Sequence, residues 1–175
     1  MLTKDNVFMV ARWFFDEPER DFHLRELARL TGLSAPGVRK ILRKLEKEGL
    51  IIITKGKVAQ SIRAARTPYF TFKKRLYNMD ALWRSGVIDS LNDAYEEPEA
   101  IVLFGSYAKG EDASQSDIDI AVVTKKKIPF SAAKFEKALH HRLHIMETDI
   151  KRAEPEFLNA LANGVVLSGY LVVVK

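Results

Sequence analysis

Residues 103–123 read LFGSYAKGEDASQSDIDIAVV, two apolar runs joined by a polar loop. The first run is followed at once by Gly105 and Ser106, and the second contains Asp117 and Asp119. Because side chains alternate between the two faces of a strand, the aspartates share one face and the isoleucines after them share the other. An unpaired carboxylate in a buried strand is costly, so this segment predicts a cation or another partner beside the aspartates.

The spacing of the two aspartates suits divalent cations. Cα atoms two residues apart in a strand are separated by about 6–7 Å. The oxygens of Asp117 and Asp119 can therefore converge on two cations about 3.5–4 Å apart. Mg²⁺ is bound by carboxylate, water and phosphate oxygens and needs neither histidine nor cysteine. Gly105 would let backbone amides approach a phosphate closely, so the segment predicts a magnesium and phosphate site.

A two-cation site ordinarily takes one more carboxylate from a neighbouring strand. The segment LHIMETDI at residues 143–150 supplies Glu147 and Asp149, which share a face if it is a strand. Asp149 lies in the acid-then-aliphatic context that Asp117 and Asp119 also have, so we predict Asp149 as the third carboxylate and keep Glu147 as the alternative. The nearby histidines fall on an expected helix and are interpreted as surface residues or as residues with satisfied hydrogen bonds: His140, His141 and His144.

Charge divides the chain into a basic first part and a mildly acidic remainder. Residues 1–80 hold 17 Lys and Arg against 9 Asp and Glu, whereas residues 81–175 hold 11 against 14. This asymmetry predicts two modules with different partners. The chain has no cysteine, which excludes disulfides and thiolate metal sites. Its apolar runs are too short to span a membrane and no signal-peptide pattern is present, so we expect a cytoplasmic protein.

The basic part begins with three segments of helical periodicity. The first ends near Pro18, the second is a short helix broken after Thr31, and Ser34 is a suitable N-cap for the third. A β-rich stretch follows, with a turn near residues 55–57 and a return strand around residues 69–72.

This order of elements resembles a winged helix-turn-helix domain. The segment LRELARLTGLSAPGVRKILRKLEKEGLI at residues 24–51 is similar to MarR- and ArsR-type transcription regulators. The resemblance implies that the third helix enters the major groove of double-stranded DNA while the hairpin, or wing, touches the backbone. The candidate DNA-binding residues are Ser34, Arg39, Lys40, Arg43 and Lys44 on the helix and Lys55, Lys57, Arg63 and Arg66 on the wing.

Two alternatives compete with DNA binding. The cations can merely solvate an amphipathic helix, or the domain can dock a protein. The acidic residues of the third helix, Glu46 and Glu48, lie at its C-terminal end, so its first turns are purely basic. Cations near a helix N-terminus oppose the macrodipole. Basic residues at the N-terminus of a helix do not stabilise it, so binding of an anionic ligand explains them better. This argument favours nucleic-acid binding over the two alternatives.

The pattern Gly-Ser, ten residues, Asp-x-Asp over residues 105–119 resembles the signature of the nucleotidyltransferase superfamily that includes DNA polymerase beta, and more closely that of the minimal nucleotidyltransferases. The resemblance implies Mg²⁺ as cofactor and a nucleoside triphosphate, ATP for preference, as substrate. The implied residues are Gly105, Ser106 and Lys109 for the phosphates and Asp117, Asp119 and Asp149 for metal binding and catalysis. Lys109 can equally be a solvated helix residue. Residues 125–127, three lysines, are interpreted as an exposed loop, with an approach to nucleotide as the alternative.

We therefore expect an α+β protein of two domains. Residues 1–75 would form the winged helix-turn-helix, and residues 96–175 an α/β nucleotidyltransferase fold with a mixed sheet. Helical spacing over residues 76–95 predicts a linker helix, whole or broken at Gly86, where glycine costs about 1 kcal/mol relative to alanine.

Two functions are compatible with these features. The first is a Mg²⁺-dependent enzyme that moves a nucleoside monophosphate to a hydroxyl of a protein partner, as minimal nucleotidyltransferases that act as antitoxins do on HEPN-type toxins. The second is a transcription regulator whose nucleotidyltransferase-like domain only senses nucleotide. The presence of Ser106, of Asp117 and Asp119, and of an acidic pair at 147 and 149 favours the enzyme, since a sensor could lose metal ligands at little cost. Winged-helix regulators commonly form homodimers, but no heptad repeat is visible, which leaves the oligomeric state open.

Overall fold

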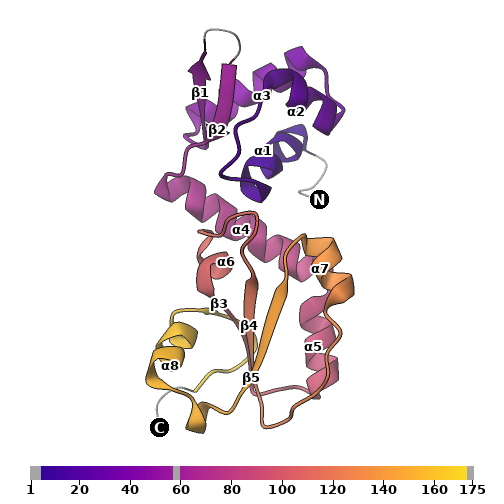
Figure 1. Ribbon diagram of the computed structural model, residues 1–175, viewed down its shortest axis with the longest axis vertical. Coiled ribbons are helices and arrows are strands. Elements are labelled where there is room, and N and C mark those ends of the chain that lie inside the picture. Colours follow the sequence, from indigo (N-terminus) through magenta and orange to yellow (C-terminus); the bar gives the residue numbers. More distant parts are fainter. Residues whose placement is uncertain (1–4, 57–59, 173–175) are drawn as a thin grey trace. The chain divides into compact units, whose positions relative to one another are not determined.

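The structure is a computed structural model that describes residues 5–56 and 60–172 (Figure 1). These residues form two compact units, which divide between Tyr77 and Asn78, and each unit is described by itself. Lys57, one of the predicted DNA-binding residues, lies outside the described residues.

The first unit consists of three helices, a hairpin and the beginning of a fourth helix. The helices are α1 (Asn6–Asp16), α2 (Leu24–Thr31) and α3 (Ala35–Lys47), the hairpin strands are β1 (Ile51–Lys55) and β2 (Gln60–Ala64), and α4 spans Pro68–Ser85. The strands are antiparallel, with Ile53 opposite Ile62. One apolar core joins the helices to the hairpin: Phe14 and Phe22 meet edge to face at 5.2 Å, and Leu27, Val38 and Ile62 are buried beside them. The predicted winged helix-turn-helix is confirmed.

The turn between α2 and α3 follows from local chemistry. Gly32 ends α2 in the left-handed region at φ 70°, where a residue without a side chain is favoured. The Ser34 hydroxyl accepts a hydrogen bond from the Gly37 N–H and so caps α3, which has a proline in its first turn. The predicted N-cap is therefore confirmed.

The predicted return strand around residues 69–72 is wrong. These residues lie in α4, and the strand that pairs with β1 is β2. Thr67 starts the helix, because its hydroxyl accepts a hydrogen bond from the Phe70 N–H. Phe70 is buried against Phe15, with ring centroids 5.3 Å apart. Packing of this aromatic side chain on α1 overrides the strand propensity of the aromatic residues.

The second unit is a mixed four-stranded sheet with helices on both faces. Its elements are α5 (Val87–Tyr95), β3 (Ala100–Phe104), α6 (Gly105–Lys109), β4 (Ile118–Val123), α7 (Ala133–Leu139), β5 (Leu143–Thr148), a 3-10 turn (Ile150–Arg152), α8 (Pro155–Ala162) and β6 (Val165–Gly169). The strand order is β5-β4-β3-β6. β3 is antiparallel to β4 and to β6, whereas β4 and β5 are parallel. The predicted mixed sheet is confirmed.

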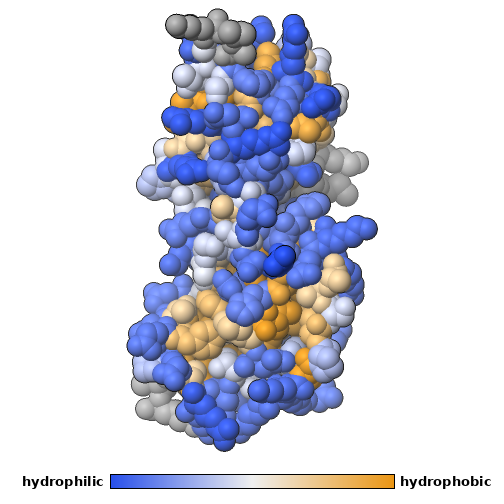
Figure 2. All heavy atoms as spheres, viewed as in Figure 1, coloured by the Kyte–Doolittle hydropathy of each residue, from blue (hydrophilic) through white to orange (hydrophobic). Residues whose placement is uncertain are grey.

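Alternation along β4 divides its side chains between two cores. Ile118, Ile120 and Val122 pack with α5 and α7, and Ala121 and Val123 pack with α8 on the other face. Figure 1 shows α5 and α7 on one side of the sheet and α8 on the other. Figure 2 shows apolar residues of this unit gathered between polar ones. Because Asp119 has the parity of Ala121, its side chain belongs to the α8 face.

The segment predicted as a linker holds a helix break. α4 ends at Ser85, Gly86 adopts φ 75°, and α5 begins at Val87. α5 is part of the second unit, because Val87, Ile88 and Leu91 are buried in its main core. Among the described residues, no helix has both the length and the apolar character needed to cross a membrane.

Candidate functional site

The pairing of β3 with β4 brings the Gly-Ser pair to the aspartates. Phe104, the last residue of β3, lies opposite Asp119 in the antiparallel register, so Gly105 follows directly beside that carboxylate. Gly105 has φ +75°, and a Cβ added to it would lie 2.5 Å from Asp119 Oδ2. Only glycine fits there without displacing the carboxylate. The backbone of the Gly-Ser turn and the Asp119 side chain therefore share one small space.

The other predicted residues of this site lie around that space. Asp117 precedes β4 and is exposed, whereas the Asp119 side chain is 28% exposed. Ser106 is half-buried in the first turn of α6, and Lys109 in its last turn is exposed. Both aspartates are thus open to a ligand, next to a turn whose backbone can be approached closely.

Asp149 does not reach the aspartates, so its prediction as the third carboxylate is wrong. β5 is parallel to β4, and Asp119 lies beside His144, whose Nδ1 is 3.1 Å from Asp119 Oδ1. Asp149 comes five residues after His144, which corresponds to about 16 Å along a strand. Residues 143–148 do form the predicted strand, but its register puts a histidine next to Asp119 and the acidic residues at the far end.

Glu147, the alternative third carboxylate, has a structural role. It lies opposite Val122, on the face away from Asp119, and accepts hydrogen bonds from the Tyr95 hydroxyl at 2.8 Å and the Ile128 N–H at 3.2 Å. Burial pushes the pKa of Glu147 upward, but these hydrogen bonds outweigh it and hold the pKa below its ordinary value. Burial, together with the bond to Glu147, raises the pKa of Tyr95 to about 12.

Removal of this hydroxyl should destabilise the second unit. We expect Tyr95→Phe to lower the free energy of unfolding by about 2 kcal/mol, because a half-buried carboxylate loses a donor. The raised pKa of Tyr95 stabilises the fold fully below pH 10, the ordinary value, and this contribution is lost as the pH rises through about 12. The difference between the wild type and the variant should therefore shrink above pH 10. Urea titrations between pH 7 and pH 11 measure it, with Tyr170→Phe, at a 79% exposed tyrosine, as control. Equal midpoints at pH 7 would contradict the role assigned to the bond.

The loop between the Gly-Ser pair and the aspartates is held by buried polar contacts. The Asn78 side-chain amide donates to Asp112 Oδ1 at 2.7 Å and to the Tyr107 carbonyl at 3.0 Å, and Asn78 and Asp112 are both buried. The Ser116 hydroxyl accepts a hydrogen bond from the Ala113 N–H at 2.9 Å. These contacts fix the position of the loop that leads to Asp117. In the sequence, Asn78 is only a polar residue within an apolar helical pattern, and this pattern does not reveal Asp112 as its partner.

The histidines do not lie on one helix, contrary to the prediction. α7 ends at Leu139, His140 has φ 58° in the following turn, and His144 belongs to β5. His141 Nδ1 lies 2.7 Å from the Ser116 carbonyl oxygen. A cavity of about 550 Å³ opens beside Asp117 between the loop of residues 114–117 and the turn of residues 140–142. His140 and His141 line this cavity and His144 contacts Asp119, so all three histidines border the site, a role that their interpretation as surface residues or residues with satisfied hydrogen bonds does not include.

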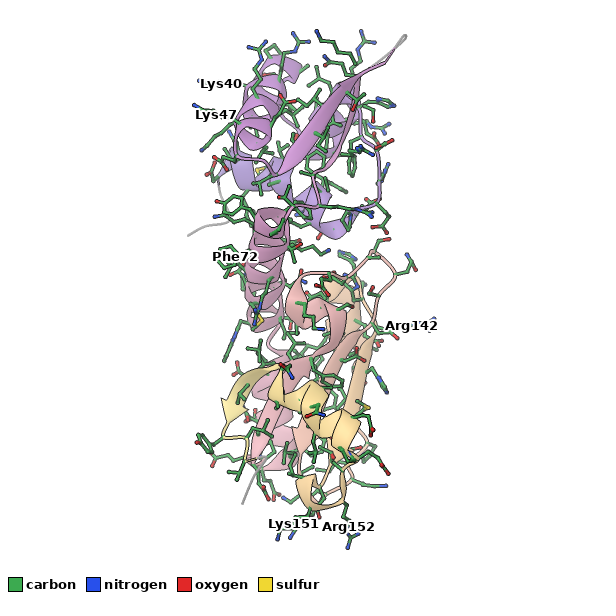
Figure 3. The ribbon with its side chains drawn as sticks, turned by 90° about the vertical axis from the view of Figure 1, so that its left-hand side faces the viewer. Lys40, Lys47, Phe72, Arg142, Lys151 and Arg152 are labelled. Carbon is green, nitrogen blue, oxygen red and sulfur yellow. The ribbon has the colours of Figure 1, made fainter. Side chains whose placement is uncertain are left out.

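The predicted DNA-binding residues of the first unit are mostly on one exposed surface. Arg39, Lys40, Arg43 and Lys44 are exposed on α3, and none forms an ion pair within the described residues. In Figure 3 the side chains of Lys40 and Lys47 extend outward from this helix. A groove of about 490 Å³ between α3 and the hairpin is lined by Arg39, Arg43 and Lys55, together with Glu46. Ser34 caps the helix, and its hydroxyl accepts from the Gly37 N–H while its O–H remains able to donate.

The two remaining arginines of the wing differ in position. Arg63 is exposed on β2, as predicted. Arg66 lies after β2, and its Nη2 donates to the Pro18 carbonyl at 3.5 Å. Arg66 is therefore not on the hairpin, because the strand ends at Ala64.

Comparison with known protein families supports the fold described for each unit. The family described as polymerase beta, nucleotidyltransferase, matches residues 87–175, and the family described as winged helix-turn-helix DNA-binding matches residues 23–52. No curated protein matches the chain. Within residues 5–56 and 60–172, no group of three or more histidine, aspartate or glutamate side chains could hold a metal ion.

Proposed function

Because the chain belongs to the polymerase beta nucleotidyltransferase family, we propose that its second unit moves a nucleoside monophosphate from ATP to an acceptor hydroxyl in a Mg²⁺-dependent reaction. The observation that supports this most directly is the space shared by Gly105 and the Asp119 carboxylate, which a single methyl group would fill. The absence of a side chain at Gly105 lets its backbone lie close to the Asp119 carboxylate, so backbone amides and carboxylate oxygens can face the same magnesium triphosphate.

The residues present fit magnesium. Mg²⁺ is bound in nucleotide sites through one or two carboxylates, with water and substrate phosphates in the remaining positions. Asp117 and Asp119 are two such carboxylates, and both are accessible. When bound there, the cation would neutralise the charge of the triphosphate during in-line displacement.

The contribution of the chain itself is mainly positioning. The Gly105 backbone and the Ser106 hydroxyl would hold the terminal phosphates, so that the acceptor hydroxyl attacks the α-phosphorus and pyrophosphate leaves. Lys109, exposed at the end of α6, would add positive charge near the phosphates. A third carboxylate is not part of the proposal, because His144 occupies the place beside Asp119.

A protein partner is the acceptor that we propose. Asp117 is exposed, and the cavity beside it is open, which suits a hydroxyl carried by another macromolecule. The sequence resembles minimal nucleotidyltransferases that act as antitoxins on HEPN-type toxins. This resemblance suggests a HEPN-type toxin as the acceptor. The winged helix would then bind double-stranded DNA and link the modification to transcription in the cytoplasm.

A second candidate function is favoured by one observation. Asp149 lies far from the aspartates, and the residue next to Asp119 is a histidine. A site with two carboxylates can bind a magnesium nucleotide without transferring it. The second unit would then act as a nucleotide sensor that changes how the winged helix binds DNA.

Label transfer separates the two functions. The full chain is incubated with Mg²⁺, ATP labelled at the α-phosphate and a lysate of cells that naturally express the protein. We expect a protein band to gain label, and EDTA to prevent it. Asp149→Asn should transfer as much label as the wild type, because Asp149 is remote from Asp119. If no band gains label and DNA binding changes on addition of magnesium ATP, the second unit is a nucleotide sensor and the enzyme function is rejected.

A further inference from the structure

A second cavity opens at the other end of the sheet from the Gly-Ser turn. It measures about 620 Å³ and is formed by the loop after β4 and the loop after β5, residues 124–127 and 147–152. These are the carboxyl ends of two parallel strands, where α/β proteins often bind ligands. Val123, at the near edge of this cavity, lies four residues after Asp119, which is about 13 Å along the strand. The lysines of residues 125–127 are therefore remote from the nucleotide site.

Four of the cations that line this cavity form no ion pair among the described residues. Lys125, Lys127, Lys151 and Arg152 are exposed, and none of them forms an ion pair within the described part of the chain. The charge of Lys127 nevertheless acts on Glu147, where it helps the hydrogen bonds to lower the pKa of that carboxyl. Lys126 differs, because it is paired with Glu96. Figure 3 shows Lys151 and Arg152 at one end of the unit and Arg142, which precedes β5, away from that end. Four cations that form no ion pair within the described ranges thus line one cavity.

The acidic residues of the cavity are directed into its own framework. Glu147 accepts from Tyr95 and Ile128, and Asp149 Oδ1 accepts from the Lys151 N–H at 3.1 Å. Glu147 partly offsets the charge of Lys127, and neither carboxylate forms an ion pair with Lys125, Lys151 or Arg152 among the described residues. The residues that the sequence suggested as metal ligands therefore shape the loops that present the cations.

The two loops are also tied to each other before any ligand binds. The Thr124 N–H donates to the Thr148 carbonyl at 2.9 Å, and the Thr124 hydroxyl accepts from the Lys126 N–H at 3.1 Å. In the second loop, the Arg152 N–H donates to the Asp149 carbonyl at 2.9 Å. The backbone of the cavity is therefore formed in advance, which lowers the ordering cost of binding.

We propose that this cavity, which we call the basic pocket, is a second anion site that binds the phosphate groups of a ligand. Lysine and arginine are the side chains that recognise phosphate, and the volume lies in the range of small-molecule sites. The phosphates can come from a free polyphosphate or from a single strand of nucleic acid. Glu147 and Asp149, the carboxylates among the lining residues described, accept hydrogen bonds from the chain itself, and the proposal includes no metal ion.

Binding without a metal ion gives a selective test. In EDTA, binding of inorganic tripolyphosphate is measured by calorimetry, and binding of a labelled single-stranded 12-mer by anisotropy. The second titration uses a chain with Arg39→Gln and Arg43→Gln, so that the winged helix contributes less. The test variant is Lys125→Gln/Lys151→Gln. The control is Lys134→Gln/Lys137→Gln, which removes the same charge from exposed positions on α7.

The proposal predicts a clear difference between these variants. For the single strand, loss of two phosphate contacts should lower the affinity about 25-fold at about 0.1 M salt and reduce the slope of log affinity against log salt by about 1.4. The control should bind as the unmodified chain does. Loss of tripolyphosphate binding alone identifies a small ligand, and loss of 12-mer binding identifies a strand. Equal binding by the test and control variants, or no binding of either probe, overturns the proposal.

Discussion

Gly105→Ala should reduce magnesium ATP binding and label transfer by about 100-fold or more, while the second unit remains folded. The added methyl would come within 2.5 Å of Asp119 Oδ2, so the carboxylate must move or the turn must open. Either change separates the phosphate-binding backbone from the cation ligand, and a displacement of about 1 Å at such a site can cost about 100-fold. Calorimetry with magnesium ATP measures binding, and the label-transfer assay measures the reaction.

A second glycine of the same unit provides the control. Gly86 has the same φ of +75°, but a Cβ added there meets nothing within 4 Å. Gly86→Ala and Gly105→Ala therefore share the backbone strain, about 1–2 kcal/mol of unfolding free energy for an alanine in the left-handed region. Only Gly105→Ala should lose nucleotide. If both variants bind magnesium ATP equally, the site does not lie between Gly105 and Asp119.

The range of the interactions explains which of the predicted site residues the structure brings together. Gly105 directly follows β3, and the two aspartates lie at the start of the neighbouring strand β4. A pattern within 15 residues was therefore enough to indicate that they lie close together. The distance between Asp149 and Asp119 depends on the register of β5 against β4. These strands are parallel and are joined by residues 124–142. A shift of a few residues in that pairing exchanges a histidine for an acid beside Asp119, and no local pattern determines it.

The same distinction applies to the fold. Ser34, Gly32 and Gly86 mark helix boundaries through their own backbone and side-chain chemistry, and the structure confirms each of them. Residues 69–72 carry aromatic side chains that are typical of strands, but Phe70 packs on Phe15 of a distant helix. The start of α4 therefore depends on a tertiary contact, against the strand propensity of its own residues. The local sequence does not reveal this contact.

Arg39→Ala/Arg43→Ala should lower the affinity for double-stranded DNA about 60-fold at about 0.1 M salt. The two side chains lie one turn apart on the exposed face of α3 and line the groove between this helix and the hairpin. Two lost phosphate contacts also reduce the slope of log affinity against log salt by about 1.8. If either arginine instead reads a base edge, the loss is about 1–3 kcal/mol and depends on the DNA sequence.

The control for this variant removes equal charge from the same unit. Arg12 on α1 and Arg75 on α4 are both exposed, and neither lies on α3 or the hairpin. Arg12→Ala/Arg75→Ala should bind DNA nearly as the wild type does, because screening limits the effect of distant charges to about 10 Å. Titrations of a labelled duplex at several salt concentrations compare the three proteins. An equal loss in both variants would show a general effect of charge, and no loss in either would assign α3 to protein docking. A loss confined to Arg39→Ala/Arg43→Ala requires a DNA contact at α3, since overall charge and the apolar core are matched in the control.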